Sequence, residues 1–410
     1  NFRFLPDPIA ATIMAEAAGG GPLLPEELII WEILTRLPAK PLLRCRAVCL
    51  SWCRRLTSDA KFLLAHHRRQ PSLPLLTEGD RSTEERRIDA LDYRTGERRP
   101  IARTTGRTAA NGDDLNVLAS CEGLLILLAN GGLQICNPAT RQRAPLTLLH
   151  GAYCISALYP HIPSRSYRVL CCFERAEDGH AVYHVHTVGS RELRCVGEPP
   201  APWASGDMVM AMPMMVYLHP HVVADSRIYW QPVKLPVGNG KVNNMLVFDT
   251  MTESFQQLLS PVEGPFLELF QMNSGALGLY HCRSGKVDLW VLQDHGSWSW
   301  SMNHRIKLDV MFFSLLPVLD PEGDVLVLSK RGETGILWQH LHHISGVNGS
   351  LLALYQWSAY LKLSRHRLKE SLVHHDFFSM EGNEGGVDEK PLFDGLSTVA
   401  LLRDDNSEPH

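Results

Sequence analysis

The stretch LLPEELIIWEILTRLPAKPLLRCRAVCLSWCRRLTSDAKFLLAHHRR, residues 23–69, places several short apolar helices in close succession. Pro25 suits the first turn of a helix because its missing N–H costs nothing there, and Glu26 and Glu27 suit the positive end of the helix dipole. Apolar residues then follow at helical spacing: Ile30, Ile33, Leu34 and Leu37. The sequence therefore predicts an amphipathic helix that begins near Pro25 and stops at Pro38.

Two more helices are predicted after this one. Residues 40–44 are interpreted as a short connector, and a second apolar stripe follows it: Cys45, Val48, Cys49, Trp52 and Leu56. Ser58 or Asp59 can cap a last helix, which carries Phe62 and neighbouring leucines and ends in a polar run before Pro71. A unit this small buries little core by itself, so its apolar residues indicate a partner surface.

The segment LPEELIIWEILTRLPAKPLLRCRAVCLSW resembles an F-box, through its Leu24-Pro25 start, Leu37-Pro38, Leu42-Leu43, Val48-Cys49 and Trp52. The resemblance implies that this module binds the Skp adaptor of a cullin-RING ubiquitin ligase. The adaptor contacts implied by the family are Leu24, Pro25, Leu28, Leu34, Leu37, Pro38, Leu42, Leu43, Val48 and Trp52. The alternative is a small helical subdomain that merely packs on the neighbouring domain.

Composition restricts the remaining function classes. The 410-residue chain is 45% hydrophobic and 20% charged, which is ordinary for a soluble globular protein, and its net charge of −4 gives no sign of nucleic-acid binding. Residues 36–69 carry many Lys and Arg against one acid, Asp59, which is either a docking surface for an acidic partner or a solvated basic face. No apolar run is long enough for a membrane helix, so no membrane partner is expected.

The ten cysteines include no CxxC pair, and several lie in apolar, strand-like runs. They therefore fit reduced, buried thiols in the cytoplasm or nucleus better than a disulfide framework. We expect residues 1–22 to be a flexible leader with the native start at Met14, residues 23–69 to be the F-box, residues 70–402 to be a β domain and residues 403–410 to be a polar tail.

After Pro71 the sequence consists of short strand-like runs between turn residues, which is typical of an all-β domain. In one recurring pattern an apolar run meets Asp or Asn, and a Thr follows three positions later. The copies are LDYRTGERRPI from Leu91, ICNPATRQRAPL from Ile135 and VFDTMTESFQQLLS from Val247. The Asp or Asn side chain can accept bonds from the backbone ahead of it, so each copy predicts a hairpin corner.

Weaker counterparts of the pattern begin at Val185, Trp290 and Leu352. The steps between the six marks are roughly 45 to 63 residues, near the blade lengths of propeller repeats. The sequence thus predicts a propeller-like domain of about six blades. We expect the late strands LVHHDFFSM and LSTVALLR to complete a blade begun near Ser72.

The same region resembles the plant F-box-associated domain. The matching patches are residues 120–125, SCEGLL, residues 136–141, CNPATR, and the corner from Asp249 to Thr252. The chain departs from the family pattern between Pro199 and Val222 and again after Ala359. The resemblance implies a kelch-like propeller that recognises a protein partner.

No catalytic or metal-binding constellation is expected, and no cofactor. Histidine pairs occur, such as His184-x-His186, but no Asp, Glu or Cys at a recognisable distance completes a metal site. Metalloprotease, nucleophile-elbow and phosphate-loop motifs are absent from the sequence. The candidate target-binding residues are in a methionine-rich segment: Met208, Met210, Met212, Met214 and Met215.

Taken together, these features predict an α+β chain, with an all-α F-box module followed by an all-β propeller-like domain. The function expected is that of a non-catalytic substrate receptor, which docks a Skp-family adaptor and recruits a protein target for ubiquitination. The alternatives are a non-degradative adaptor-binding scaffold and a propeller enzyme or small-ligand-binding protein.

Overall fold

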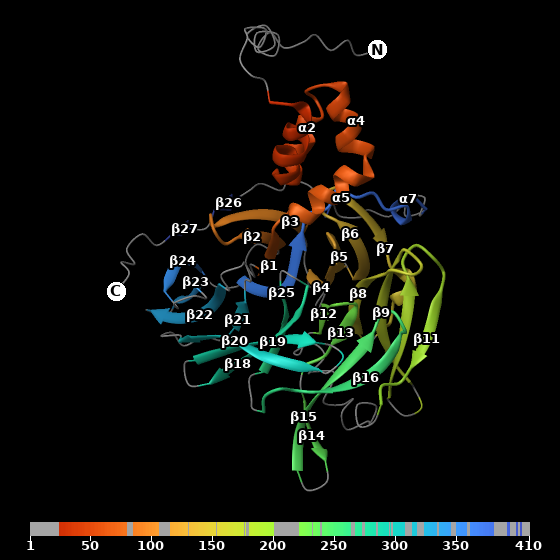
Figure 1. The fold of residues 1–410 in the computed structure, drawn as a ribbon, viewed down its shortest axis with the longest axis vertical. Helices are drawn as coiled ribbons and strands as arrows, with labels where there is room; N and C mark the ends of the chain where they lie inside the picture. Colours follow the sequence, from red (N-terminus) through yellow and green to blue (C-terminus); the bar gives the residue numbers. More distant parts are fainter. Residues whose placement is uncertain are drawn as a thin grey trace. The chain divides into compact units, whose positions relative to one another are not determined.

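The fold is that of a computed structural model of the 410-residue chain (Figure 1). The chain divides into two compact units, residues 1–70 and residues 71–410. The structure describes residues 24–79, 85–105, 115–129, 131–152, 154–175, 177, 180–200, 221–231, 233–237, 240–263, 267–272, 275–283, 286–294, 296, 298–307, 314–317, 324–333, 336–345, 350–358, 361–380, 392–393, 399–400 and 402–403.

The first unit is helical. Its opening helical segment runs from Glu26 to Arg36, as predicted, in three consecutive pieces: α2 (Glu26–Leu28), the π-helical turn η1 (Ile29–Ile33) and the 3-10 turn η2 (Leu34–Arg36). Leu37 then adopts an extended backbone, which ends the segment before Pro38. The later helices are α3 (Ala39–Cys45), α4 (Leu50–Ser58) and α5 (Ala60–Arg69).

The prediction of a connector over residues 40–44 was wrong, because these residues lie in α3. Pro38 stops the preceding helix but also precedes a new one, in which Pro41 occupies the first turn, where a proline leaves no intrahelical bond unmade. The second apolar stripe is accordingly split between two helices. Cys45 ends α3, and Cys49 has an extended backbone and caps α4, its Sγ accepting a bond from the Trp52 N–H at 3.4 Å.

The second unit is built of strands, which confirms the all-β prediction for this part of the chain. The described strands form six antiparallel sheets. The first three sheets along the chain are as follows: β1 (Ser72–Gly79), β2 (Glu85–Asp92) and β3 (Glu97–Thr105); β4 (Asn116–Cys121), β5 (Leu124–Ala129), β6 (Gly132–Asn137) and β7 (Gln142–Pro145), followed by the 3-10 turn η3 (Thr147–Leu149); and β8 (Cys154–His161), β9 (Ser166–Glu174), β10 (Ala181–Thr187) and β11 (Leu193–Gly197).

The three later sheets are antiparallel as well, although the fourth does not pair its strands in strict chain order. Their strands are β12 (Val222–Ala224), β13 (Arg227–Tyr229), β14 (Val233–Val237), β15 (Gly240–Asp249) and β16 (Ser254–Leu259); β17 (Leu267–Gln271), β18 (Leu277–Arg283), β19 (Lys286–Asp294) and β20 (Ser299–Lys307); and β21 (Ser314–Pro317), β22 (Val325–Glu333), β23 (Ile336–Ile344) and β24 (Leu351–Ser358). The remaining elements are β25 (Leu361–Lys369), α7 (Phe377–Met380), β26 (Val399–Ala400) and β27 (Leu402–Arg403).

The first sheet is completed from the far end of the chain. Strand β25 pairs with β1, so that one sheet joins residues 361–369 to residues 72–105 in the order β25-β1-β2-β3. Strands β25, β4, β8, β12, β17 and β21 each lie at one edge of their sheet, and β25 packs beside both β4 and β21. The β unit is therefore closed by β25, which connects its first sheet with its second and its last (Figure 1).

The closing strand differs from the ones predicted. Residues 372–380, LVHHDFFSM, do not form a strand, because residues 377–380 are the helix α7. Residues 396–403, LSTVALLR, contribute the two-residue strands β26 and β27, which extend the outer edges of β3 and β24. The segment that does close the first sheet, LKLSRHRLK, carries so many charged side chains that its sequence gave no strong strand signal.

The recurring Asp/Asn and Thr pattern forms hairpin corners, as predicted, and these join β2 to β3, β6 to β7 and β15 to β16. Asp249 Oδ1 accepts bonds from the N–H groups of Met251 at 2.9 Å and Thr252 at 3.0 Å. The Asn137 side chain does the same at its own corner, with the N–H groups of residues 139 and 140 at 3.1 and 3.4 Å. In all three strong copies the next residue has a positive φ: 73° at Gly96, 59° at Arg141 and 52° at Glu253.

Two of the three weaker marks, those from Val185 and Trp290, also fall on hairpins, which join β10 to β11 and β19 to β20. The mark from Leu352 is out of phase, because it falls between β24 and the closing strand β25. The last two strands of that sheet before β25, β23 and β24, pair with each other directly.

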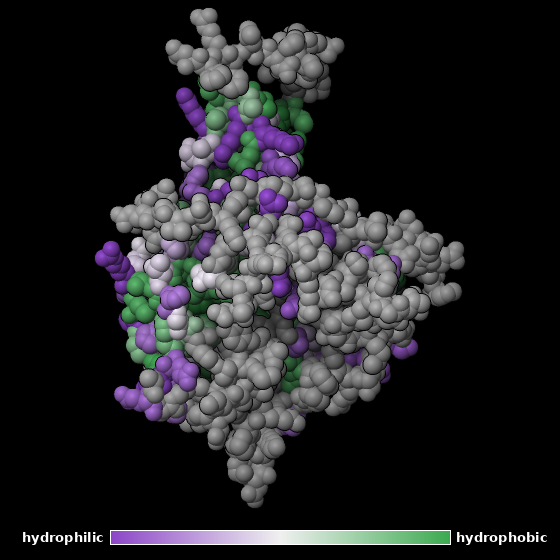
Figure 2. All heavy atoms as spheres, turned by 180° about the vertical axis from the view of Figure 1, so that it is seen from behind, coloured by the Kyte–Doolittle hydropathy of each residue, from purple (hydrophilic) through white to green (hydrophobic). Residues whose placement is uncertain are grey.

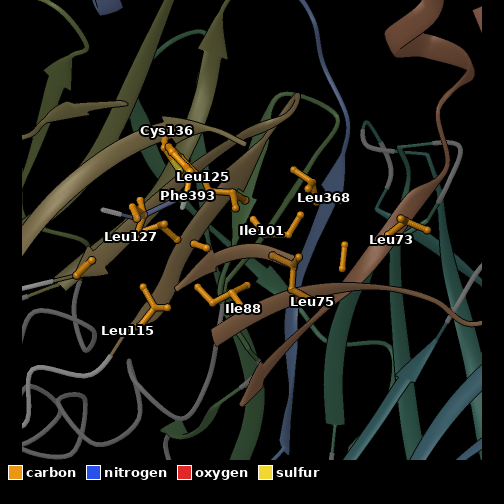
Figure 3. Close-up of a cluster of buried hydrophobic side chains, with 14 residues drawn as sticks. Leu73, Leu75, Ile88, Ile101, Leu115, Leu125, Leu127, Cys136, Leu368 and Phe393 are labelled. Atoms are coloured by element: carbon orange, nitrogen blue, oxygen red, sulfur yellow. The ribbon is translucent and has the colours of Figure 1, made fainter. Parts of the chain in front are cut away.

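The hydrophobic core lies between neighbouring sheets. Figure 3 shows one such cluster, in which Leu75 of β1 and Ile88 of β2 lie with Leu125 and Leu127 of β5 and with Leu368 of β25. All five side chains are buried. The alternation of inward and outward residues along each strand supplies one apolar face to each such interface.

The corner at Gly96 is held by an aromatic side chain of another sheet. Tyr355 of β24 donates a bond from its hydroxyl to the Tyr93 carbonyl at 2.9 Å, and its ring leaves no room for a Cβ at Gly96, which would lie 2.6 Å from Tyr355 Cε1. This contact ties the first sheet to the last at their outer strands, in addition to the contact of β25.

We expect Gly96→Ala to destabilise the β unit by more than the roughly 1–2 kcal/mol that a left-handed backbone costs an alanine, because the new methyl group also displaces Tyr355. Gly151→Ala is the matched control: its φ is +88°, but a Cβ there meets no atom within 4 Å. Urea unfolding of both variants measures the difference. Equal losses of stability in the two variants would contradict the contact with Tyr355.

Candidate protein-interaction site

The helical unit has a small core that fixes its helices relative to one another. The fully or almost fully buried apolar residues are Ile30, Leu34, Ala39, Leu42, Leu56, Phe62 and Leu63. The Trp31 ring lies against Phe62, with ring centroids 6.0 Å apart, and Phe62 stacks on His66 at 6.5 Å. Every helical segment except α2 contributes a buried residue, so the unit has one shared core.

Polar contacts connect the end of α5 to the first helical segment. The Gln70 side-chain amide donates to the carbonyls of Thr35 at 3.2 Å and Leu37 at 3.1 Å. His66 Nε2 lies 2.8 Å from the same Leu37 carbonyl, and Arg69 bonds Thr35 Oγ1 at 2.5 Å. The bonds of Gln70 and His66 satisfy carbonyls that the end of η2 leaves without intrahelical partners.

The start of the first segment is connected to α4. Arg55 forms an ion pair with Glu27 at 3.1 Å, and Ser51 donates a hydrogen bond to Glu26 at 3.2 Å. Glu27 also accepts a bond from Trp31 Nε1 at 2.9 Å. These groups are largely solvent-exposed, so each contributes little stability, but together they fix the position of α4 beside the start of the chain's described part.

The outer surface of the unit exposes large apolar side chains. Among the described residues these are Leu24, Leu28, Ile33, Val48, Leu50 and Leu64. Leu50 is 76% exposed and Leu24 is 59% exposed, which leaves most of both side chains in water. Figure 2 shows hydrophobic residues beside hydrophilic ones on the helical unit. A mixed surface of this kind is typical of a protein-interaction site.

The ten residues predicted to contact an adaptor fall into three groups. Leu24, Pro25, Leu28 and Val48 are exposed. Leu37, Pro38, Leu43 and Trp52 are partly exposed. Leu34 and Leu42 are 3% and 0% exposed and belong to the core, so a partner that contacts the surface of the unit cannot reach them.

Three further exposed apolar residues of the described part of this unit, Ile33, Leu50 and Leu64, are not among the predicted adaptor contacts. The sequence predicts Ile33 and Leu64 to be apolar residues of helices, and Leu50 is the first residue of α4. The sequence signal for Leu50 is that it lies outside the apolar stripe of Cys45, Val48, Cys49, Trp52 and Leu56, which favours an exposed side chain.

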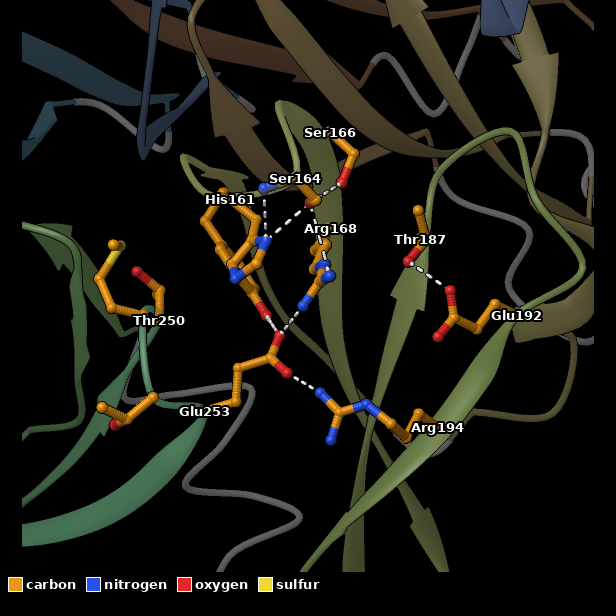
Figure 4. A network of polar contacts seen from close by, with 12 residues as sticks. His161, Ser164, Ser166, Arg168, Thr187, Glu192, Arg194, Thr250 and Glu253 are labelled. Atoms are coloured by element: carbon orange, nitrogen blue, oxygen red, sulfur yellow. Dashed lines mark hydrogen bonds and ion pairs between the residues drawn. The ribbon is translucent and has the colours of Figure 1, made fainter.

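The β unit contains polar side chains that are clustered between its sheets. Figure 4 shows one around Glu253, the positive-φ residue of a corner. Its carboxylate accepts bonds from Tyr159 at 3.0 Å and Arg168 at 2.6 Å and pairs with Arg194. Because the three donors come from β8, β9 and β11 and the acceptor from the β15–β16 turn, the cluster ties two sheets together.

The environment of Glu253 leaves no group poised for chemistry. Burial raises the pKa of the Tyr159 phenol, which is thereby kept protonated and able to donate. Burial, with the nearby Arg168 and Arg194, lowers the pKa of His161. The carboxylate itself is saturated by two guanidinium groups and one hydroxyl, so the cluster acts as a structural tie between sheets.

Histidine pairs in the β unit have structural partners. His184 and His186 bond the carbonyls of Val182 and Glu192, at 3.2 and 3.0 Å. Among the residues that the structure describes, His, Cys, Asp and Glu side chains are nowhere gathered in threes where a metal ion could be held. In this same part of the chain each helix is too short or too polar to span a bilayer. The methionine-rich candidate segment, residues 208–215, lies outside the described residues.

Comparison with protein families identifies the β unit. A family described as the F-box associated beta propeller domain matches residues 101–314, which is just over half of the chain. The chain belongs to this family. Since the matched residues run from β3 to β21, the F-box associated domain comprises most of the sheets described above.

Solved structures resemble this F-box associated protein only weakly. TolB from Acinetobacter baumannii is 9% identical, with a TM-score of 0.42 over 78% of this chain and 70% of its own. The complex of KlAtg21 with the coiled-coil of AgAtg16 gives 8% identity and a TM-score of 0.36, over 70% of this chain and 91% of the other. Likenesses this weak support no inference. No curated protein matches the chain.

The structure selects Asp59 over Ser58 as the cap of α5, because Asp59 Oδ1 accepts bonds from the N–H groups of Lys61 at 3.0 Å and Phe62 at 3.2 Å. We expect Asp59→Ala to destabilise the helical unit by about 1 kcal/mol, the usual cost of losing such a cap. Hydrogen exchange of the α5 amides measures it. Ser58→Ala is the control, since Ser58 only bonds the Arg54 carbonyl, and an equal effect in that variant would contradict the assignment.

The helical unit should also lose stability in mild acid. Burial lowers the pKa of His66 below the ordinary histidine value of about 6.5, so the unfolded chain binds a proton at a higher pH than the folded chain does. Stability is therefore complete above about pH 6.5 and declines as the pH falls from there through the folded pKa of His66. Protection factors of the α5 amides on both sides of this pH measure the decline.

His66→Gln is the matched variant for that experiment. Gln retains an N–H donor for the Leu37 carbonyl but does not ionise in this range. We expect its α5 protection to depend less on pH than that of the unmodified chain. The same decline in both proteins would assign the effect to other groups.

Proposed function

We propose that this chain is the substrate-recognition subunit of a Skp-cullin-F-box ubiquitin ligase. In this proposal the helical unit is an F-box that docks a Skp-family adaptor, and the β unit, with each of its six sheets as one propeller blade, recruits a protein target. The chain itself carries out no bond chemistry. It raises the effective concentration of a bound target beside the ubiquitin-carrying machinery.

One observation carries the proposal: a helical unit with exposed leucines directly precedes an F-box associated propeller domain in the same chain. The order of residues in the helical unit resembles an F-box from Leu24 to Trp52. Burial of exposed side chains such as Leu24 and Leu50 against a partner would be favourable by about 25 cal/mol per Å² of apolar surface.

The basic side chains of the helical unit support a partner with acidic surface. Arg44, Arg54 and Arg68 are exposed, and the segment over residues 36–69 holds one acid, Asp59, whose side chain caps α5. Complementary charge would increase the association rate more than the affinity. We place the assembly in the cytoplasm or nucleus, where reduced cysteines are the rule.

The test is co-purification of the full chain with a Skp-family adaptor. We expect stoichiometric binding, and a loss of affinity of about tenfold or more for the double variant Leu24→Ala, Pro25→Ala and for Leu50→Ala, since truncated interface anchors typically cost more than 1.4 kcal/mol. Both sites are exposed, so the substitutions leave the core of the unit intact.

Leu259→Ala is the matched control. Leu259 is 62% exposed on the β unit, so its truncation removes comparable apolar surface from the other part of the chain. Unchanged adaptor binding by this variant, together with loss in the two helical-unit variants, would support the proposed docking surface. Absence of adaptor binding by the folded, unmodified chain would overturn the proposal.

A further inference from the structure

Two cysteines lie side by side on neighbouring strands of the third sheet. Cys154, the first residue of β8, is the register partner of Cys172 on β9. Their Sγ atoms are 2.7 Å apart, and both side chains are buried. They share a core cluster with Tyr183 and Trp230.

The backbone at this pair suits a covalent bridge. Directly opposed residues of an antiparallel pair have Cβ atoms about 4.5–5.5 Å apart, slightly more than a disulfide needs. Strand β8 departs from regular pairing between Ile155 and Ala157, next to Cys154. Such an irregularity reorients the adjacent side chain, and here the two sulfur atoms lie closer together than unbonded sulfur atoms normally do.

The neighbouring cysteine on β9 has a different environment. Cys171 pairs in register with Ile155, belongs to another core cluster and lies 3.5 Å from the His184 carbonyl, to which its thiol donates. Because successive side chains on a strand point to opposite faces, Cys171 and Cys172 project into different cores. Although Cys171 and Cys172 are adjacent in the sequence, only Cys172 lies beside Cys154.

The electrostatics of the pair differ from those of the other buried thiols. Burial raises the pKa of Cys136 and of Cys171 to about 12, which keeps both unreactive. The Cys172 thiol and the Ser156 hydroxyl, 3.5 Å away, both donate toward Cys154 and lower the pKa of Cys154, whereas the pKa of Cys172 is raised. Cys154 is accordingly the thiol that ionises first.

We propose that Cys154 and Cys172 are a redox pair that hydrogen peroxide converts into an intramolecular disulfide between β8 and β9. The Cys154 thiolate attacks one peroxide oxygen, giving a sulfenic acid and hydroxide. The Cys172 sulfur then attacks Cys154 Sγ, the S–O bond breaks and the hydroxyl leaves as water with the proton of Cys172. Overall, two thiols are oxidised and one peroxide is reduced to two waters.

The bridge would stiffen the part of the β unit that holds Glu253. The loop that it closes contains Tyr159 and Arg168, two of the three groups bound to the Glu253 carboxylate. A disulfide stabilises chiefly by restricting the unfolded chain. The oxidised protein should therefore unfold at a higher temperature than the reduced protein.

The test uses the purified full chain, reduced and then treated with graded hydrogen peroxide. After alkylation of the remaining thiols in denaturant, intact and peptide mass spectrometry should show the loss of two hydrogen atoms and a cross-link between the peptides of Cys154 and Cys172. The unfolding temperature should rise on oxidation and return to its first value after reduction.

Two serine variants identify which of the two adjacent cysteines forms the cross-link with Cys154. Cys172→Ser should give no cross-link, and Cys171→Ser should form the same cross-link as the unmodified chain, which separates the adjacent residues. The proposal is overturned if Cys171→Ser abolishes the cross-link, if another cysteine pair is bridged instead, or if the unmodified chain retains all its thiols until sulfinic acid forms. Because the unmodified chain is itself informative, misfolding of one variant does not remove the test.

Discussion

The pairing of β1 with β25 is the constraint on which the β unit depends. An isolated four-stranded sheet with an apolar face would remain half exposed, and each sheet here buries that face only against its neighbours. Bringing Leu361–Lys369 back to Ser72–Gly79 joins the two ends of the series, so that the first sheet has a neighbour on both sides. The entropy of closing a loop of nearly three hundred residues is offset by burial along the entire unit.

The corners reinforce this closure at the outer strands. In each strong copy of the Asp/Asn and Thr pattern, the local hydrogen bonds form the turn, and a group from a distant part of the β unit then holds it. Tyr355 contacts Gly96, the carbonyl of Ser371 accepts a bond from Asn137 at 3.0 Å, and Arg168 pairs with Glu253. A motif that forms a turn locally thus also connects the sheets, which explains why it recurs at equivalent positions.

The helical unit is stabilised by a different set of interactions. Its core has few residues, and several of its connections are exposed ion pairs that add little stability. Its stability depends instead on the caps and on the bonds of His66, Arg69 and Gln70 to the end of the first segment. The apolar side chains that remain outside are the basis of the proposed docking function, and burial against a partner would complete a core that the unit cannot complete alone.

The sequence by itself determined the features that depend on interactions between residues close together in the chain. The strand-rich character, the corners at Asp92, Asn137 and Asp249 and the capped helix α5 were all predictable, because each rests on hydrogen bonds or periodicity within a few residues. The F-box associated family could also be recognised from short patches such as CNPATR.

Tertiary structure decided what depends on distant contacts. The closing strand β25 is rich in charged residues, so its pattern did not reveal that it pairs with β1. Periodicity placed Ile30, Ile33 and Leu34 on one apolar face, but packing buried Ile30 and Leu34 and left Ile33 45% exposed. The proximity of Cys154 and Cys172 likewise follows from strand register, since a sequence gives the order of residues along a strand but not the residues that will lie opposite them.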